Sequence, residues 1–314
     1  MRVMPGQCTS PFTRAAAAAL WLGLSLAGCS KSAPATPSAN TFDTPEAAVR
    51  SLNDAVTKGD LARVVEIFGS EGKDLVDTSD PETARRNREV VAAAMREAWH
   101  LEDQGKAKVL IVGHEGWPFP VPLVKDTSGW RFDTAAGKEE VLARRIGRNE
   151  LAVIRVCRTY VAAQRAYAAF AHDRNPKGVY AVSFRSDEGR QNGLYWPAKP
   201  GQPRSPLGAL LQEAEQRAAS GGDAQAPFHG YYFRILTGQG AAAAGGAKDY
   251  VVNGRMTGGF ALIAWPAFYD STGVMTFIVN GDGVVYEKDL GPETDAAARK
   301  VSAYDPDGSW MPVN

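Results

Sequence analysis

The order of hydrophobic spacings along the chain limits its fold more than any other feature. Apolar residues recur at helical spacing in the early part of the chain, and strand-like alternation begins near residue 107. The same change, from helical spacing to alternation, occurs again after residue 137. This order predicts an α+β fold in which helices precede an antiparallel sheet twice. Because 314 residues suffice for two cores, we expect two small domains, at residues 42–135 and 137–314.

Three helices are predicted at the start of the first domain. The segment Asp43–Glu46 combines a capping side chain with a proline at the first helical position, and the helix that it opens ends at Gly59. Residues 60–69 have the same pattern on a shorter scale. A third helix is predicted from Pro81 to Gly105, followed by strands at residues 107–113 and 129–133. The segments TPEAAV, AVTKGDLARVVEIF and LVKDTSGWRFD resemble the nuclear-transport-factor-2-like class of small cone-shaped domains.

Between the two predicted strands, Pro118, Pro120 and Pro122 occupy alternate positions in an apolar segment. Alternate amide groups of an extended strand point to the same side, so these prolines remove hydrogen-bond donors from one edge only. The pattern predicts an edge strand that is protected against pairing with another strand. The alternative is a polyproline-like recognition surface that includes Trp117 and Trp130.

The second domain is predicted to begin with a long helix and to continue as an antiparallel sheet. The helix spans residues 137–173 with an interruption at Gly147, and Cys157 lies in its core-facing stripe, where a buried and inert thiol is expected. One more helix is predicted over residues 205–221. Alternating strands follow, and Asn280–Gly283 is expected to form a hairpin turn. The stripe comprises Val153, Val156, Cys157, Tyr160, Ala163 and Tyr167.

Two resemblances to known families follow from longer segments. The segments NELAVIRVCRTYVAAQRAYA, GYYFRI and GVMTFIVNGDGVVY are remotely similar to the globular part of type IV pilins and pseudopilins. No hydrophobic assembly helix or prepilin cleavage site precedes them, so we do not expect a pilus subunit. The segments WPFPVPLVKD, RRIGRNEL, GLYWPAKPG, HGYYFRILTGQG and GGFALIAWPAFYDSTG identify the chain as a member of a bacterial lipoprotein family, domain-of-unknown-function family 2950. That resemblance implies an exported, envelope-associated protein.

The first residues of the chain have the pattern of an export signal. Arg2 and Arg14 are the only charged residues before Lys31, and an apolar run follows them over residues 15–28. The run is short and rich in alanine, which is typical of a cleaved secretory signal rather than of a spanning helix. It ends at Cys29.

The four residues Leu26–Cys29 resemble the lipobox of bacterial lipoproteins. In that family the chain is cleaved just before the cysteine, here between Gly28 and Cys29, and the cysteine is acylated with chains such as palmitate. The resemblance implies a lipoprotein signal peptide over residues 1–28, lipidation at Cys29 and an anchor made of several acyl chains. Residues 29–41 are rich in Ser, Ala and Pro, and we expect them to form a flexible tether.

The residue pattern assigns no catalytic, cofactor-binding or metal-binding residue. His100, His114, His172 and His229 lack the spacing of metal ligands, and no G-x-S-x-G elbow occurs. A Ser-x-x-Lys match at residues 70–73 contains a glycine that weakens the helix that this motif needs. The glycine-rich segment TGQGAAAAGGAKDY is expected to be a hairpin loop. Lys plus Arg and Asp plus Glu both number 35, so no basic excess predicts a nucleic-acid partner.

These observations predict an exported, lipid-anchored envelope protein that acts as a noncatalytic binding or interaction module. Ser30 stands where an inner-membrane retention signal has aspartate, which favours the outer membrane and a periplasm-facing protein. The partner, an envelope protein or a ligand, stays open. The alternative is a periplasmic envelope enzyme of the hydrolase type with an unrecognised active site.

Two kinds of surface would distinguish these functions. Titratable residues that converge in a pocket would favour the enzyme. An exposed aromatic patch would favour the binding module. Tyr195, Trp196 and Trp265 are the candidates for such a patch, although we expect each to be packed in the core.

Overall fold

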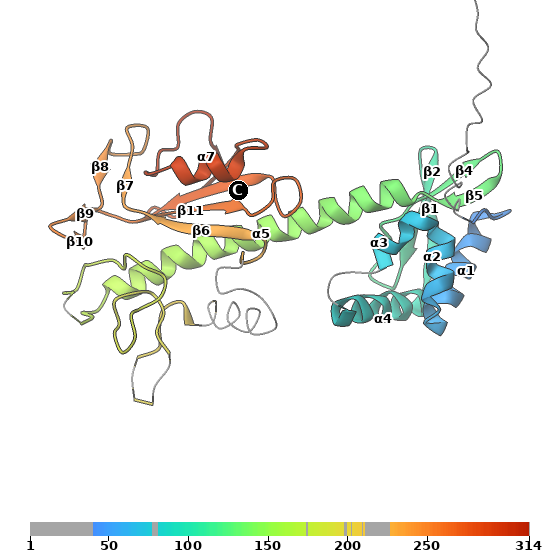
Figure 1. Cartoon of the computed structure of the whole chain (residues 1–314), viewed down its shortest axis with the longest axis horizontal. Coiled ribbons are helices and arrows are strands. Elements are labelled where there is room, and N and C mark those ends of the chain that lie inside the picture. The colour runs from blue at the N-terminus through green and yellow to red at the C-terminus, as the bar shows by residue number, and fades with distance from the viewer. Residues whose placement is uncertain are drawn as a thin grey trace, which may run out of the picture. The chain divides into compact units, whose positions relative to one another are not determined.

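The structure is a computed structural model, shown in Figure 1, and it describes residues 40–76, 81–173, 175–197, 200–201, 203–208, 210 and 227–313. The predicted signal peptide and Cys29 lie outside the described residues, as does most of the helix predicted over residues 205–221. Within these described ranges, no helix is both long and apolar enough to cross a membrane.

The first helices begin and end where their capping residues predict. Helix α1 (Pro45–Lys58) starts after Thr44, whose side chain accepts a hydrogen bond from the Ala47 amide, and it ends at Gly59 with a φ of 69°. Asp60 caps the next helix in the same way. The helical elements that follow α1 are α2 (Leu61–Phe68), η1 (Ser70–Gly72), α3 (Lys73–Val76) and α4 (Pro81–Glu97).

These helices precede an antiparallel sheet whose strand order is β1-β2-β4-β5, with β3 also paired to β2. The core of this part is built from apolar side chains of α1, α2, α4 and the sheet, and its largest members that expose at most 1% of their surface are Leu52, Ile67, Leu110, Leu123 and Phe132. The strands are β1 (Trp99–Gln104), β2 (Ala107–Val112), β3 (Trp117–Pro118), β4 (Leu123–Asp126) and β5 (Gly129–Phe132).

The predicted extent of the third helix is wrong. Helix α4 ends at Glu97, and residues 99–104 form β1 instead of a last helical turn. All six residues of β1 pair with β2 through a tight turn in which Gly105 has a φ of 63°. Pairing with β2 therefore outweighs the helical spacing of this segment. Cross-strand contacts determine the conformation of a short segment whose sequence fits both a helix and a strand.

The proline run is only partly an edge strand. The Phe119 amide donates to the Leu110 carbonyl of β2, so the amide positions of Pro118 and Pro120 face the other side, as predicted. The strand breaks after Pro118, however, and it resumes as β4 inside the sheet, between β2 and β5. The outward carbonyl of Pro118 accepts a 2.8 Å hydrogen bond from Arg144. A side chain thus covers part of the edge that the prolines leave without donors.

Helix α5 (Thr134–Ala168) is continuous over 35 residues, so the interruption predicted at Gly147 is wrong. A glycine costs a helix interior only about 1 kcal/mol, which the packing of the flanking turns offsets. The proposed boundary at residue 136 falls in the first turn of this helix. The Thr134 hydroxyl donates to the Phe68 carbonyl at 2.6 Å, which ties that turn to α2. The division into domains 42–135 and 137–314 stays a prediction, and the residues at its junction are helical.

The second sheet is antiparallel with the order β14-β13-β12-β11-β6. Figure 1 shows α5 and α7 (Thr294–Lys300) on opposite faces of this sheet, which explains why every residue of β11 is buried. The predicted turn at Asn280–Gly283 joins β12 to β13, as the hydrogen bond from the Gly283 amide to the Asn280 carbonyl shows. The strands are β6 (Tyr231–Leu236), β11 (Ala261–Pro266), β12 (Met275–Asn280), β13 (Val285–Asp289) and β14 (Met311–Pro312).

The predicted core stripe of α5 is confirmed, since all six of its residues are buried. Cys157 exposes 0% of its surface, and burial raises the pKa of its thiol to about 12. Two short hairpins complete this half: β7 (Gly238–Gln239) with β8 (Lys248–Asp249), and β9 (Val251–Val252) with β10 (Arg255–Met256). The described chain is thus α+β, with helices followed by antiparallel sheets.

Candidate functional site

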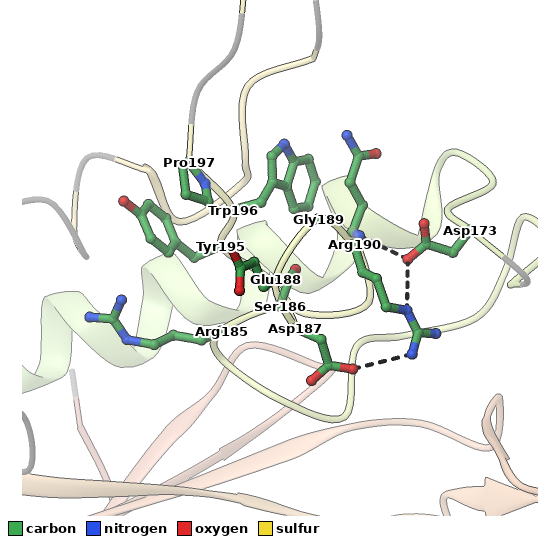
Figure 2. Close-up of a pocket in the computed structure, with 11 residues that line it drawn as sticks. Asp173, Arg185, Ser186, Asp187, Glu188, Gly189, Arg190, Tyr195, Trp196 and Pro197 are labelled. Carbon is green, nitrogen blue, oxygen red and sulfur yellow. Dashed lines mark hydrogen bonds and ion pairs between the residues drawn. The ribbon is translucent and has the colours of Figure 1, made fainter.

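A pocket of about 570 Å³ lies beside the loop that follows α5 (Figure 2). Its size falls in the range of ~300–1,000 Å³ that is typical of small-molecule sites. Charged residues and aromatic residues line it together: Asp173, Arg185, Ser186, Asp187, Glu188, Gly189, Arg190, Gln191, Tyr195, Trp196 and Pro197.

The last turns of α5 contact the residues that line this pocket. The Tyr167 hydroxyl donates to the Gln191 carbonyl at 2.9 Å. Burial raises the pKa of the Tyr167 hydroxyl. The His172 ring stacks on Tyr167 with the ring centroids 4.2 Å apart, and its centroid lies 5.5 Å from that of Trp196. An aromatic stack therefore connects the helix end to the pocket wall.

A buried amide fixes the segment that leads into the loop. Gln164 exposes none of its surface, and its side chain both donates to the Ala181 carbonyl (2.8 Å) and accepts from the Ala181 amide (2.9 Å). It also donates to the Tyr160 hydroxyl at 3.0 Å. The side chain of Gln164 takes the place of a strand partner for Ala181, as buried backbone groups require.

The loop closes on itself through a close approach of two backbone segments. The Ser186 amide donates to the Tyr195 carbonyl at 2.8 Å. A Cβ atom at Gly193 would lie 2.5 Å from the Arg185 carbonyl carbon, so only glycine fits there. The Ser186 hydroxyl accepts from the Gly193 amide at 2.9 Å. These contacts hold both ends of the charged segment in place.

Arg190 lies between two carboxylates, those of Asp173 and Asp187 (Figure 2). Its Nη1 atom lies 3.2 Å from Oδ2 of Asp187, and its Nε atom lies 3.8 Å from Oδ2 of Asp173. The same Asp173 oxygen accepts from the Gln191 amide (2.8 Å), and the same Asp187 oxygen accepts from the Asn192 side chain (2.7 Å). The charged side chains of the pocket are thus held in a network rather than projecting singly.

Two aromatic residues close the pocket on another side. Tyr195 and Trp196 expose only 8% and 4% of their surface. The Trp196 indole nitrogen donates to the Pro203 carbonyl at 3.0 Å, and the Arg185 guanidinium lies 5.5 Å from the Tyr195 ring centroid. These side chains give the pocket a fixed apolar boundary.

The structure brings some of the predicted aromatic candidates together and separates others. Tyr195 and Trp196 line the pocket, whereas Trp265 is buried in the second sheet and donates to Asp295 at 2.9 Å. The expectation that all three are packed in the core is confirmed. Trp117 is 44% exposed and stacks with Arg144, away from these residues.

The histidines and the Ser-x-x-Lys match do not form a site. His100 pairs with Glu102 at 3.1 Å on an exposed strand, and His172 is packed behind the pocket. Ser70 and Lys73 lie in two consecutive short helical elements. In the described part of the chain, no three His, Cys, Asp or Glu side chains are placed to hold a metal ion, and this includes the pocket acids.

The charged residues of the pocket were not identified from the sequence. Their signal is the segment RSDEGRQNG, in which residues 185–193 carry four charges and two glycines. Such a segment usually forms a solvated turn. Residues 185–191 line the pocket because they contact the end of α5. These contacts join residues that are distant in the sequence, so no local sequence pattern predicts them.

Titratable residues converge in this pocket, and the polar groups among them are held by contacts with one another. The Ser186 hydroxyl is held by both the amide and the carbonyl of Gly193, at 2.9 and 3.4 Å, so it is not poised against a base. Arg190 neutralises part of the charge on Asp173 and Asp187. Carboxylates, a guanidinium and the exposed parts of two largely buried aromatic side chains thus line the pocket in positions fixed by contacts within the chain.

A family profile described as Protein of unknown function (DUF2950) matches residues 39–313. The chain belongs to this family. The predicted membership of family 2950 is thereby confirmed, and the match covers both sheets and the pocket. No curated protein and no solved structure matches the chain significantly.

Proposed function

We propose that the protein is an exported, lipid-anchored envelope protein that acts as a noncatalytic binding module. The pocket beside residues 185–197 is its ligand site, and an acylated Cys29 is its anchor. The single observation that carries the binding role is the preformed network around Arg190, whose partners Asp173 and Asp187 come from two separate turns.

The sequence of the first 41 residues supports the anchor. Arg2 and Arg14, the apolar run and Leu26–Cys29 follow the order of a lipoprotein signal. Each buried CH₂ group of an acyl chain contributes about 0.8 kcal/mol, so several chains hold a protein stably at a membrane. Residues 29–41 then serve as the tether that lets the folded part reach a ligand, and the proposed location is the periplasmic side of the outer membrane.

The arrangement of elements supports two fold relationships as part of this proposal. We propose that residues 42–135, in which helices precede the first sheet, are related to nuclear-transport-factor-2-like domains. We propose likewise that residues 137–314, in which a long helix precedes the second sheet, are related to the globular domains of pilins. Both relationships are arguments from architecture, which leaves the function to the site itself.

One observation favours the second candidate, an envelope hydrolase. Asp173, Asp187 and Glu188 place three carboxylates around one pocket, and hydrolases of glycosidic bonds use a pair of carboxylates as acid and base or nucleophile. Product release from a bound substrate would favour this enzyme. Asp187→Asn and Glu188→Gln variants would then lose turnover while they keep their fold.

The anchor is tested by labelling cells with radioactive palmitate. Cys29→Ser should lose the label and accumulate uncleaved precursor. Cys8→Ser, which changes a cysteine of the predicted signal outside the lipobox, should keep the label and is the matched control. Label that persists on Cys29→Ser would refute the anchor.

The binding role is tested by crosslinking in intact cells. Arg190→Gln should reduce the adducts formed by the wild-type chain, because it releases Asp173 and Asp187 from their shared partner. Arg255→Gln changes an exposed arginine of β10 and should leave the adducts unchanged. Equal adduct patterns for wild type and Arg190→Gln would refute a ligand site in this pocket.

A further inference from the structure

The charges of the pocket are nearly balanced, which restricts the class of ligand. Three carboxylates (Asp173, Asp187, Glu188) and two guanidiniums (Arg185, Arg190) line it, so the formal sum is one negative charge. A cationic ligand would meet both guanidiniums, and an anionic ligand would meet the three carboxylates. Desolvating either ion against like charges is costly, whereas a neutral polar ligand avoids that cost.

The carboxylate oxygens that make no hydrogen bond within the chain, together with the Arg190 guanidinium, favour a ligand that both donates and accepts hydrogen bonds. The side-chain hydrogen bonds and ion pairs of Asp173 and Asp187 use Oδ2. Within the described residues, no hydrogen bond reaches their Oδ1 atoms or the Glu188 carboxylate. Carboxylates only accept hydrogen bonds, and the neighbouring guanidinium of Arg190 only donates. A hydroxyl group can donate to the first and accept from the second, so neighbouring hydroxyls match this alternation.

The aromatic boundary adds a requirement for an apolar face. In the view of Figure 2, Tyr195 and Pro197 lie on the side of the pocket away from Asp173, and Trp196 lies between them and Asp173. A ligand in this pocket therefore presents hydroxyls toward the charged network and carbon-bound hydrogens toward the rings. Pyranose rings have this distribution, with hydroxyls around the rim and C–H bonds on the faces.

We propose that the pocket binds a neutral saccharide. Its hydroxyl groups bond to Asp173, Asp187 and Arg190, and its C–H groups contact the small exposed parts of Tyr195 and Trp196, which are 8% and 4% of their surface. The volume of about 570 Å³ accommodates a short saccharide segment rather than a single small ion. This inference rests on the proposed function, because it names the ligand class of the same pocket.

The test uses the full chain in a polyoxyethylene detergent, which carries no sugar headgroup. The probes are maltotriose, cellotriose and triacetylchitotriose, with trilysine and triglutamate as charged competitors, and binding is followed by isothermal titration calorimetry. At least one trisaccharide should bind, with an affinity that is nearly unchanged between low salt and ~0.5 M salt, because a neutral ligand is not screened.

Variants assign the binding to the pocket. Asp187→Asn and Arg190→Gln should each weaken trisaccharide binding by about tenfold, which corresponds to the loss of one charge-assisted hydrogen bond. Arg255→Gln is the control and should bind as the wild type does. Circular dichroism melting curves that match the wild type show that the variants are folded.

Two outcomes overturn the inference. The first is binding of trilysine or triglutamate, weakened by salt and by Arg190→Gln, without binding of any trisaccharide. The second is the absence of binding by all three trisaccharides to the folded protein. In both cases the proposed function stands if Arg190→Gln still removes adducts in cells, and it fails separately if those adducts persist.

Discussion

Two glycines of helix α5 should respond in opposite directions to the same substitution. Gly147 lies in the middle of the helix, and a Cβ atom placed there meets no atom within 4 Å. Gly137 lies one turn from the helix start, where a Cβ atom would lie 2.7, 2.9 and 3.1 Å from three side-chain carbons of Val121. The helix thus has space for a methyl group at Gly147 and none at Gly137.

The magnitudes follow from helix propensity and packing. Gly147→Ala should raise the free energy of unfolding by about 0.5–1 kcal/mol, the usual gain of alanine over glycine in a helix interior. Gly137→Ala gains the same propensity, but overpacking against Val121 costs about 1–3 kcal/mol. The net effect at Gly137 is a loss of about 0.5–2 kcal/mol.

The assay is chemical denaturation followed by far-ultraviolet circular dichroism, for both single variants and for a double-mutant cycle. In a Val121→Ala background, the space beside residue 137 opens, and Gly137→Ala should become neutral or stabilising. The sign change of one substitution between two backgrounds isolates the contact. The reasoning would be refuted by a Gly137→Ala variant that is stabilised as much as Gly147→Ala, or by additive effects in the cycle.

Three further experiments test Gln164, Cys157 and Glu287. Gln164→Leu should lower the free energy of unfolding by about 2–4 kcal/mol, because it leaves buried backbone groups unpaired. Gln104→Leu, at the exposed end of β1, should change it little, and denaturant midpoints will show both effects. Burial raises the pKa of the Cys157 thiol to about 12. With the other two cysteines replaced by serine, Cys157 of the folded protein should therefore resist a thiol-specific disulfide reagent at pH 8 and react fully in denaturant. Fast reaction of the folded protein would contradict this expectation. Burial and the nearby charge of Glu150 raise the pKa of the Glu287 carboxyl. The protonated carboxyl therefore stabilises the folded protein below the ordinary pKa of glutamate, and this stabilisation is lost as the pH rises through the pKa of Glu287 in the folded state. Glu287→Gln should therefore raise the melting temperature at pH 7, and this gain should vanish in acid; an equal gain at both pH values would argue against the carboxylate.

The elements that the sequence predicted correctly carry local signals. Thr44, Pro45 and Gly59 each act within a few residues of their position, so the bounds of α1 follow from short-range chemistry. Asn280–Gly283 is likewise a local turn whose side chains bond to each other, at 3.0 Å from Asn280 Nδ2 to Asp282 Oδ2. Such features are independent of what packs against them.

The errors occur where a distant partner decides the outcome. The segment Trp99–Gln104 continues the helical spacing of α4, and only its six pairs with β2 make it a strand. Gly147 carries the local signal of a break, but the contacts of the helix on either side keep α5 continuous. In both cases tertiary packing outweighs a propensity difference of about 1 kcal/mol.

The pocket shows why the site was harder to predict than the fold. Tyr195 and Trp196 could be singled out as aromatic residues, but their charged neighbours looked like a solvated turn. Asp173 reaches Arg190 because its backbone has a φ of 47°, because Tyr167 holds the Gln191 carbonyl, and because the segment 181–193 is pinned at its start and end. The side chain of Gln164 makes the contact at the start of this segment, with Ala181, although it does not line the pocket. A ligand that needs this network should therefore bind less tightly to Gln164→Leu than to the wild type even when the variant is still folded, because the loop must then be ordered on binding.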